Sequence, residues 1–186
     1  ALAEEWNALG SEVDPATMPL TRLVNSAVDG VAREMDAVRA EIVRYAGSDL
    51  LCYRAEGPER LASLQNEHWD PPLAFVRERF GLRFALAGGI MHVAQPEETA
   101  ERFDRALGDP DALTLAALSS ITTLTGSAVL ALALLHQGIG AEAAWAAAHV
   151  DEDYQASLWG TDEEAAQRRA ARKGEFDAAT FVLGVS

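Results

Sequence analysis

Cysteine is almost absent from this chain of 186 residues, in which Cys52 is the only one. A single cysteine excludes a disulfide framework, a CxxC redox pair and a zinc site built from several thiolates. Free thiols persist in reducing compartments, so the composition indicates the cytosol or an organelle matrix. The sequence also opens at Ala1 without an initiator Met or a signal-type apolar segment, and we expect it to be a piece of a longer protein.

Positive charge is also scarce. Lys plus Arg number 15 against 29 Asp plus Glu, which gives a formal net charge of −14. This charge repels phosphate backbones and anionic lipid, so nucleic acid is not expected as a partner. A solvated acidic exterior without a specific purpose is the commoner explanation of such a composition, although the charge would also suit a partner with a basic or aggregation-prone surface.

Charge is missing altogether from residues 112–135. A spanning helix needs ~20 apolar residues, so length alone would permit a membrane helix here. However, the run carries several Ser and Thr residues near its middle, and neither an aromatic belt nor basic residues flank it. We therefore predict two buried helices that meet at Thr125-Gly126-Ser127, with no membrane insertion.

The residue patterns of metal and catalytic sites are missing too. No two of the four histidines stand three or four residues apart, the spacing that would aim both imidazoles at one metal. The sequence also lacks a G-x-S-x-G elbow, a Cys-His signature and an S-x-x-K pair. We expect no metal, no cofactor and no enzymatic activity. The four histidines are His68, His92, His136 and His149.

One glycine-rich stretch keeps an enzymatic alternative open. Residues 138–143 fit G-x-G-x-x-A between an apolar run and a helix, which is the context of a dinucleotide-binding fingerprint. The preceding run is rich in Ala and Leu rather than β-branched residues, and no second strand follows. A turn between two helices is favoured, and a nucleotide-binding enzyme that uses Gly138–Ala143 remains the alternative.

The first half of the chain mixes helical and extended patterns. Apolar residues at spacings of three and four predict one long amphipathic helix over residues 20–45. Residues 50–55 predict a short strand, and residues 83–93 predict a hairpin around a glycine pair. Residues 58–69 predict a further helix, which Asp70-Pro71-Pro72 should end.

The second half predicts helices almost throughout. Asp109-Pro110-Asp111 should open the uncharged helix, and Thr161-Asp162-Glu163-Glu164 forms a capping box before an Arg-rich helix. We place an internal boundary near Gln95-Pro96, between a mixed α+β portion (1–95) and a helical bundle (96–186). The predicted fold class is α+β and predominantly helical.

Residues 151–160 have the composition of an interface, because carboxylates stand directly before aromatic residues. The predicted contact residues are Asp151, Glu152, Asp153 and Gln155. Helical spacing suggests that the aromatic residues instead pack the helix on the bundle and hold the acids in place. The predicted packing residues are Tyr154, Leu158, Trp159, Trp69 and Trp6.

Four motifs occur together in a characteristic order and spacing: MPLTRL at 18–23, DLLCYR at 49–54, QNEHWDP at 65–71, and DYQ at 153–155 followed by WG at 159–160. From Leu2 to about Gly160 the chain resembles the F-type ATP synthase assembly chaperone dedicated to the alpha subunit. This is the "ATP-twelve" family of mitochondria and alpha-proteobacteria.

The resemblance implies an ATP-independent holdase that binds the free alpha subunit and masks its beta-facing surface until the hexamer assembles. It implies no reaction and no small-molecule substrate, an orthogonal helical bundle in the C-terminal half, and a bacterial cytoplasmic or mitochondrial matrix location. The family's functionally important Glu corresponds to Asp151, and the Trp of its A-x-x-W stretch corresponds to Trp6.

The chain also departs from the family pattern. We expect the family's β-rich N-terminal portion to be missing ahead of Trp6, and the tail after Arg168 matches poorly. An adaptor or scaffold domain that shares the fold but serves another protein is a further alternative.

Overall fold

In the residues that the structure describes, the regular elements are helices and one pair of short strands. The computed structural model describes residues 1–10, 13–89, 91–160 and 162–185. The predominantly helical α+β class predicted from the sequence is confirmed. The elements are α1 (Leu2–Asn7), η1 (Pro15–Thr17), α2 (Pro19–Asp29), η2 (Val31–Arg33), α3 (Met35–Ala46), η3 (Leu50–Cys52), β1 (Tyr53–Arg54), α4 (Glu59–Phe80), β2 (Ala87–Gly88), α5 (Thr99–Leu107), α6 (Ala112–Thr125), α7 (Ala128–Leu135), α8 (Ala141–Ala148), α9 (Val150–Trp159) and α10 (Glu163–Val182).

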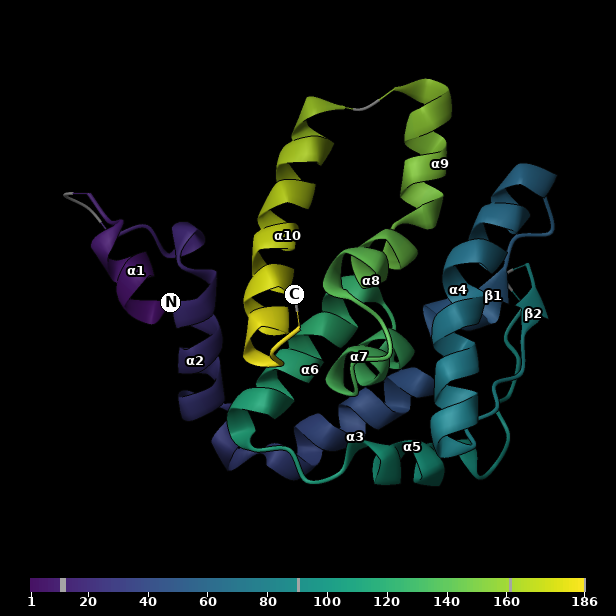
Figure 1. Cartoon of the computed structure of the whole chain (residues 1–186), viewed down its shortest axis with the longest axis horizontal. Helices are drawn as coiled ribbons and strands as arrows, with labels where there is room; N and C mark the ends of the chain where they lie inside the picture. The colour runs from purple at the N-terminus through teal and green to yellow at the C-terminus, as the bar shows by residue number, and fades with distance from the viewer. Residues whose placement is uncertain (11–12, 90, 161, 186) are drawn as a thin grey trace.

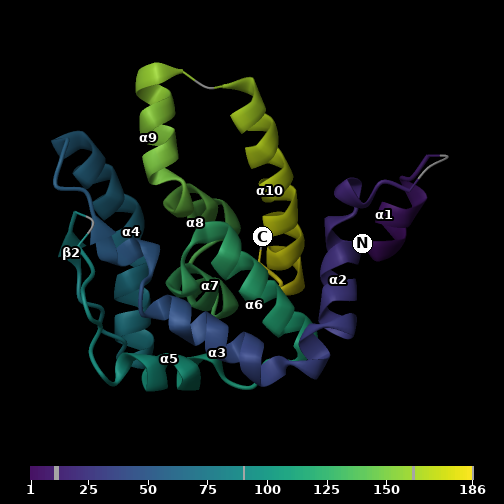
Figure 2. The same ribbon diagram turned by 180° about the vertical axis from the view of Figure 1, so that it is seen from behind.

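α6 and α7 form the centre of the molecule. α7 is buried from Ala128 to Leu134, and the inner residues of α6 join the same apolar core. α2, α3 and α10 pack on α6, whereas α4 packs on α7. In Figure 1, α3 and α5 lie below this centre, and α9 and α10 project from the opposite end. The view from behind shows α4 with its strands on one flank and α1 with α2 on the other (Figure 2).

The uncharged run is divided into two helices, as predicted. α6 ends at Thr125, Gly126 adopts a left-handed φ of 68°, and Ser127 caps α7 by accepting a hydrogen bond from the Leu130 amide. The Thr125 hydroxyl donates to the Ile121 carbonyl at 2.7 Å, so this buried polar group is satisfied. Among the described residues, no helix is long and apolar enough to cross a membrane.

The prediction of one long helix over residues 20–45 is wrong, because the chain turns at Gly30. α2 ends there, the short 3₁₀ turn η2 follows, and α3 begins at Met35. A straight helix of that length would extend for roughly 39 Å and could touch the compact core along only part of its face. The break lets both α2 and α3 bury their apolar faces against α6.

The prediction that Asp70-Pro71-Pro72 ends a helix is also wrong. α4 continues through both prolines to Phe80 and ends at Gly81, whose φ is 69°. Each interior proline removes a hydrogen bond, at a cost of about 3 kcal/mol or more in an isolated helix. Tertiary packing offsets this cost, because Trp69 before the prolines and Val76 after them are both fully buried.

The predicted hairpin is absent from the described part of residues 83–93. β2 instead pairs in parallel with β1, with Tyr53 opposite Ala87 and Arg54 opposite Gly88. The side-chain amide of Gln95 accepts from the Ala85 N–H at 2.8 Å and donates to the Ala85 carbonyl at 3.0 Å, so it replaces the backbone of a second arm. The strand predicted at residues 50–55 is a 3₁₀ turn followed by β1. Ile90, part of the predicted hairpin, lies outside the described residues.

Two helix starts agree with their predicted caps. The Asp111 carboxylate accepts from the Thr114 amide at 2.7 Å, and Asp162 accepts from the Ala165 amide at 3.1 Å. Thr161 of the predicted capping box lies outside the described residues. The division of the chain near Gln95-Pro96 stays a prediction, and helices from both sides of it share one apolar cluster.

A buried carboxylate joins the first half of the chain to the central helices. Asp49 is fully buried and accepts hydrogen bonds from the Ser127 hydroxyl at 2.8 Å, the Val129 amide at 2.9 Å and the Leu51 amide at 3.0 Å. Burial raises the pKa of Asp49 to about 6, although these bonds to the charged form oppose the shift. Asp49 therefore fixes η3 and β1 to the start of α7.

Asp49→Asn tests this link. The amide can keep two acceptor bonds but turns a donor toward the Val129 N–H, so we expect a loss of about 1–3 kcal/mol in the free energy of unfolding. The pKa of Asp49 in the folded protein, about 6, lies above its ordinary 3.8. The stability that this carboxyl contributes to the wild-type protein therefore falls as pH rises from 3.8 to about 6. Asn does not titrate. In urea unfolding, the loss caused by Asp49→Asn should therefore be about 1 kcal/mol smaller at about pH 7.5 than at about pH 5. A loss that does not change with pH would contradict the raised pKa of Asp49 in the folded protein.

Candidate partner-binding site

The segment predicted to contact a partner forms one wall of a groove. α9 and α10 extend from the core side by side (Figures 1 and 2), and a groove of about 620 Å³ lies between them. Ala156 and Trp159 line it from α9, and Ala165, Ala166 and Arg169 line it from α10. Residues three or four apart share a helix face, so each wall presents one face of its helix.

The base of the groove is anchored by buried aromatic residues. The Trp69 indole N–H of α4 donates to the Ala147 carbonyl of α8 at 2.7 Å. The Trp145 ring lies 3.9 Å from the His149 ring and 5.1 Å from that of Phe176 in α10, measured between centroids. α8 is thereby held to both α4 and α10, so the two walls rise from one rigid base.

Asp151 points toward α4. Its carboxylate accepts from the Gln65 side-chain amide at 2.7 Å, and the Gln65 carbonyl oxygen accepts from the Ala55 N–H at 2.7 Å. Gln65 is buried, so both of these bonds satisfy polar groups that water cannot reach. Asp151 therefore orients α9 relative to α4 and the chain after β1.

The next two acids differ in their surroundings. Asp153 forms a two-point ion pair with Arg169 of α10, one arm of which is 3.1 Å long, and this hydrogen bonding raises the pKa of Arg169. Glu152 is exposed and lies 4.0 Å from Nε2 of His149. Burial lowers the pKa of His149, so that imidazole is neutral near pH 7. Glu152 makes no hydrogen bond with a described residue, and it lines the groove together with Asp151 and Gln155.

Of the five residues predicted to support packing, the structure buries two and exposes three. Tyr154 and Trp69 are buried, whereas Trp159 is 83% exposed and Leu158 is 51% exposed. Both lie in the last turn of α9, which Gly160 ends at a φ of 85° after the helix has left the core. Trp6 is 53% exposed because α1 lies on the outer side of α2 (Figure 1).

Three residues of the site had no predicted role. Gln65 holds Asp151, Arg169 holds Asp153, and Arg172 donates to the Leu124 carbonyl at the end of α6. Gln65 belongs to the QNEHWDP motif, so the family resemblance marked this residue. No physical reason for its role could be seen in the sequence alone. Arg169 and Arg172 stand in an Arg-rich helix where the sequence alone does not distinguish paired from solvated arginines.

The Gly138–Ala143 turn connects two helices. α7 precedes it and α8 follows it, so the strand that a dinucleotide fingerprint requires does not precede the turn. A Cβ at Gly138 would lie 2.4 Å from the Phe75 ring of α4, which explains the glycine by close packing. Within the described part of the chain, no cluster of three or more His, Cys, Asp or Glu residues could hold a metal.

Comparison with known proteins identifies the family. A family model described as ATP12 chaperone protein matches residues 1–77. The crystal structure of Atp12 from Paracoccus denitrificans matches with a TM-score of 0.90 and 37% identity, over 98% of this chain and 78% of that one. The chain belongs to the ATP12 chaperone family. The resemblance seen in the sequence motifs is therefore confirmed.

Two further proteins are similar to this chain. The Atu1473 protein of Agrobacterium tumefaciens matches with a TM-score of 0.92 and 46% identity, over 98% of this chain and 68% of that one. Protein atp12, mitochondrial, of Schizosaccharomyces pombe is 26% identical over 174 residues, which cover 88% of this chain. The chain spans 60% of the length of that relative. The ATP12 family is one of chaperones and not of enzymes.

Gly138→Ala tests whether packing explains the glycine turn. The new methyl group would overlap the Phe75 ring, so we expect a loss of about 1–3 kcal/mol in the free energy of unfolding. Gly174→Ala is the matched control, because a Cβ at that helical position meets no atom within 4 Å. It should stabilise the protein by about 0.5–1 kcal/mol. Chemical denaturation of both variants measures the difference, and equal effects would refute the packing explanation.

Proposed function

We propose that this protein is an assembly chaperone of the ATP synthase that binds the free alpha subunit and masks its beta-facing surface until the hexamer assembles. Membership of the ATP12 chaperone family supports the general activity. The observation that carries the binding mode is the groove between α9 and α10 with the exposed Trp159 on its wall.

The groove combines the features of a protein-binding surface. Tryptophan supplies a large apolar area with a hydrogen-bonding edge and is enriched among the residues that dominate binding energies. Leu158 extends the apolar area beside it. The small side chains of Ala156, Ala165 and Ala166 leave room for a partner to approach both walls closely.

Glu152 supplies the charge of this contact. It lines the groove and makes no hydrogen bond with a described residue, whereas the Asp151 and Asp153 carboxylates, which are also exposed, are hydrogen-bonded to Gln65 and Arg169. A subunit that awaits a ring exposes an apolar interface prone to self-association, and a reversible acidic binder keeps it separate. No reaction or cofactor is needed, because the competing subunit can displace the chaperone by mass action.

The proposal is tested with separately purified alpha and beta subunits. Light scattering during mild heating should show that this protein suppresses aggregation of the alpha subunit and leaves that of the beta subunit unchanged. Protection of neither subunit would favour an adaptor for another protein partner. A saturable response in a dinucleotide titration would instead revive the nucleotide-binding alternative.

Two substitutions locate the surface in the same assay. Trp159→Ala should weaken alpha-subunit binding by about 2 kcal/mol, or roughly 30-fold, and Glu152→Lys should weaken it through charge reversal. Neither side chain is buried, so the melting temperature should not change. Asp151→Lys is unsuitable, because it would also break the bond to Gln65.

Glu67→Lys is the control for charge reversal. Glu67 is exposed on α4 and does not line the α9–α10 groove. The Glu67→Lys variant should bind the alpha subunit as the unsubstituted protein does. Full binding by both Trp159→Ala and Glu152→Lys would place the contact elsewhere.

The location follows from the same proposal. It is the cytoplasm for a bacterial protein and the mitochondrial matrix for a eukaryotic one, where ATP synthase is assembled. The Schizosaccharomyces pombe relative is named as a mitochondrial protein.

A further inference from the structure

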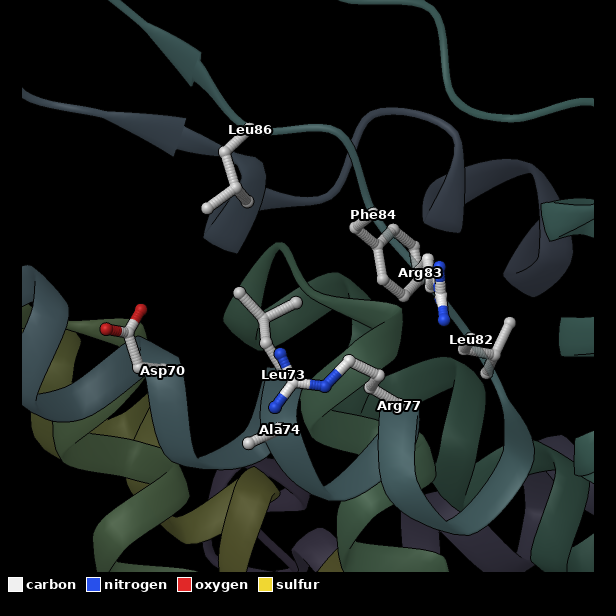
Figure 3. A pocket seen from close by; sticks show the side chains of 8 residues that line it. All are labelled: Asp70, Leu73, Ala74, Arg77, Leu82, Arg83, Phe84 and Leu86. Carbon is white, nitrogen blue, oxygen red and sulfur yellow. The ribbon is translucent and has the colours of Figure 1, made fainter.

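A second groove, of about 740 Å³, lies between α4 and the extended segment that follows it. Figure 3 shows Leu73 rising from α4 with Phe84 and Leu86 on the other side, and the Arg77 side chain extended along α4 toward Leu73. Leu86 is half exposed, and Phe84 and Leu73 are partly buried. The groove therefore has an apolar lining that remains open to solvent.

The charge of this groove is positive in a strongly acidic protein. Arg83 is exposed and forms no ion pair with any described residue. Among the described residues, Arg77 forms an ion pair only with its sequence neighbour Glu78, at 3.7 Å. Asp70 at the other end is already paired with Arg54 at 2.8 Å. Two guanidinium groups are thus available to a carboxylate.

The extended segment also offers an open backbone edge. The Gly89 N–H bonds to the Arg54 carbonyl at 2.8 Å, and Gln95 occupies both backbone groups of Ala85. Successive peptide groups of an extended chain point to opposite sides, so Phe84 and Leu86 direct theirs away from β1. Neither makes a backbone hydrogen bond with a described residue. Such an edge can accept another strand.

We propose that this groove binds an extended segment of a partner polypeptide, in which apolar and acidic residues alternate, as an added strand beside Phe84 and Leu86. The partner's apolar side chains pack against Leu73, Phe84 and Leu86. Its carboxylates lie on the opposite face of the strand beside Arg83, within the positive field of Arg77. The backbone bonds supply affinity, and the alternating side chains supply specificity. This surface is distinct from the α9–α10 groove and does not depend on which subunit that groove binds.

A labelled heptapeptide that alternates valine and glutamate is the probe. Fluorescence anisotropy with the whole chain should show saturable binding that weakens as salt is added. A peptide with lysine in place of glutamate, and one with N-methylated backbone nitrogens, should each bind at least tenfold more weakly. Equal binding of the lysine peptide would overturn the charge requirement, and equal binding of the N-methylated peptide would overturn strand addition.

Protein variants separate this groove from other surfaces. Arg77→Glu and Arg83→Glu should each weaken binding of the valine–glutamate peptide at least tenfold. Arg60→Glu, which reverses an exposed charge in the first turn of α4, should leave binding unchanged. Thermal melting checks that all three variants fold. Unchanged affinity in both Arg77→Glu and Arg83→Glu would overturn the proposal.

Hydrogen exchange locates the bound peptide. The Phe84 and Leu86 amides should become protected on peptide addition, while those of α9 and α10 stay unchanged. Protection confined to α9 and α10 would overturn the proposal. A concentration-dependent dimer that the peptide dissociates would instead assign this edge to a second copy of the chain, and would overturn it as well.

Discussion

The buried carboxylate of Asp49 is the interaction on which the arrangement of this molecule depends. It places a charge in the apolar centre, and three hydrogen bonds from η3, Ser127 and α7 compensate the loss of water. This position fixes β1 against the core. The chain after β1 then offers its Ala55 amide to Gln65, which in turn holds Asp151 and the start of α9. The groove wall is therefore oriented through bonds that begin at Asp49.

α4 connects the two candidate binding surfaces. Gln65 and Trp69 hold the base of α8 and α9, and two turns later Leu73 and Arg77 line the second groove. The helix can serve both because it continues through two prolines, with its packing offsetting the lost backbone bonds. A binding protein without catalysis requires this kind of rigid support, because preorganised surfaces lose less entropy when a partner binds.

The acidic run shows how neighbouring carboxylates divide structural and binding roles. The Asp151 carboxylate accepts a hydrogen bond from the neutral Gln65 amide, whereas the Asp153 charge is paired with Arg169. Glu152 lies between them on the helix and faces outward. Successive helical residues point about 100° apart, so three adjacent acids cannot share one environment. All three acids are exposed, and among the described residues Asp153 alone is paired with a cationic side chain.

The amino-acid sequence by itself determined the features that arise from local chemistry. The two central helices, the Asp111 cap and the helix–glycine–helix turn follow from residues close together in the chain, and the family follows from four motifs. Tertiary structure alone decided the break at Gly30, the passage of α4 through its prolines, the parallel register of β2 and the exposure of Trp159. Each of these depends on contacts between residues far apart in sequence. At Gly30 and at the α4 prolines, burial of apolar surface against distant parts of the chain outweighs the local preference for helix or for a helix end. Trp159 is exposed because α9 ends beyond the core, where no such burial is available.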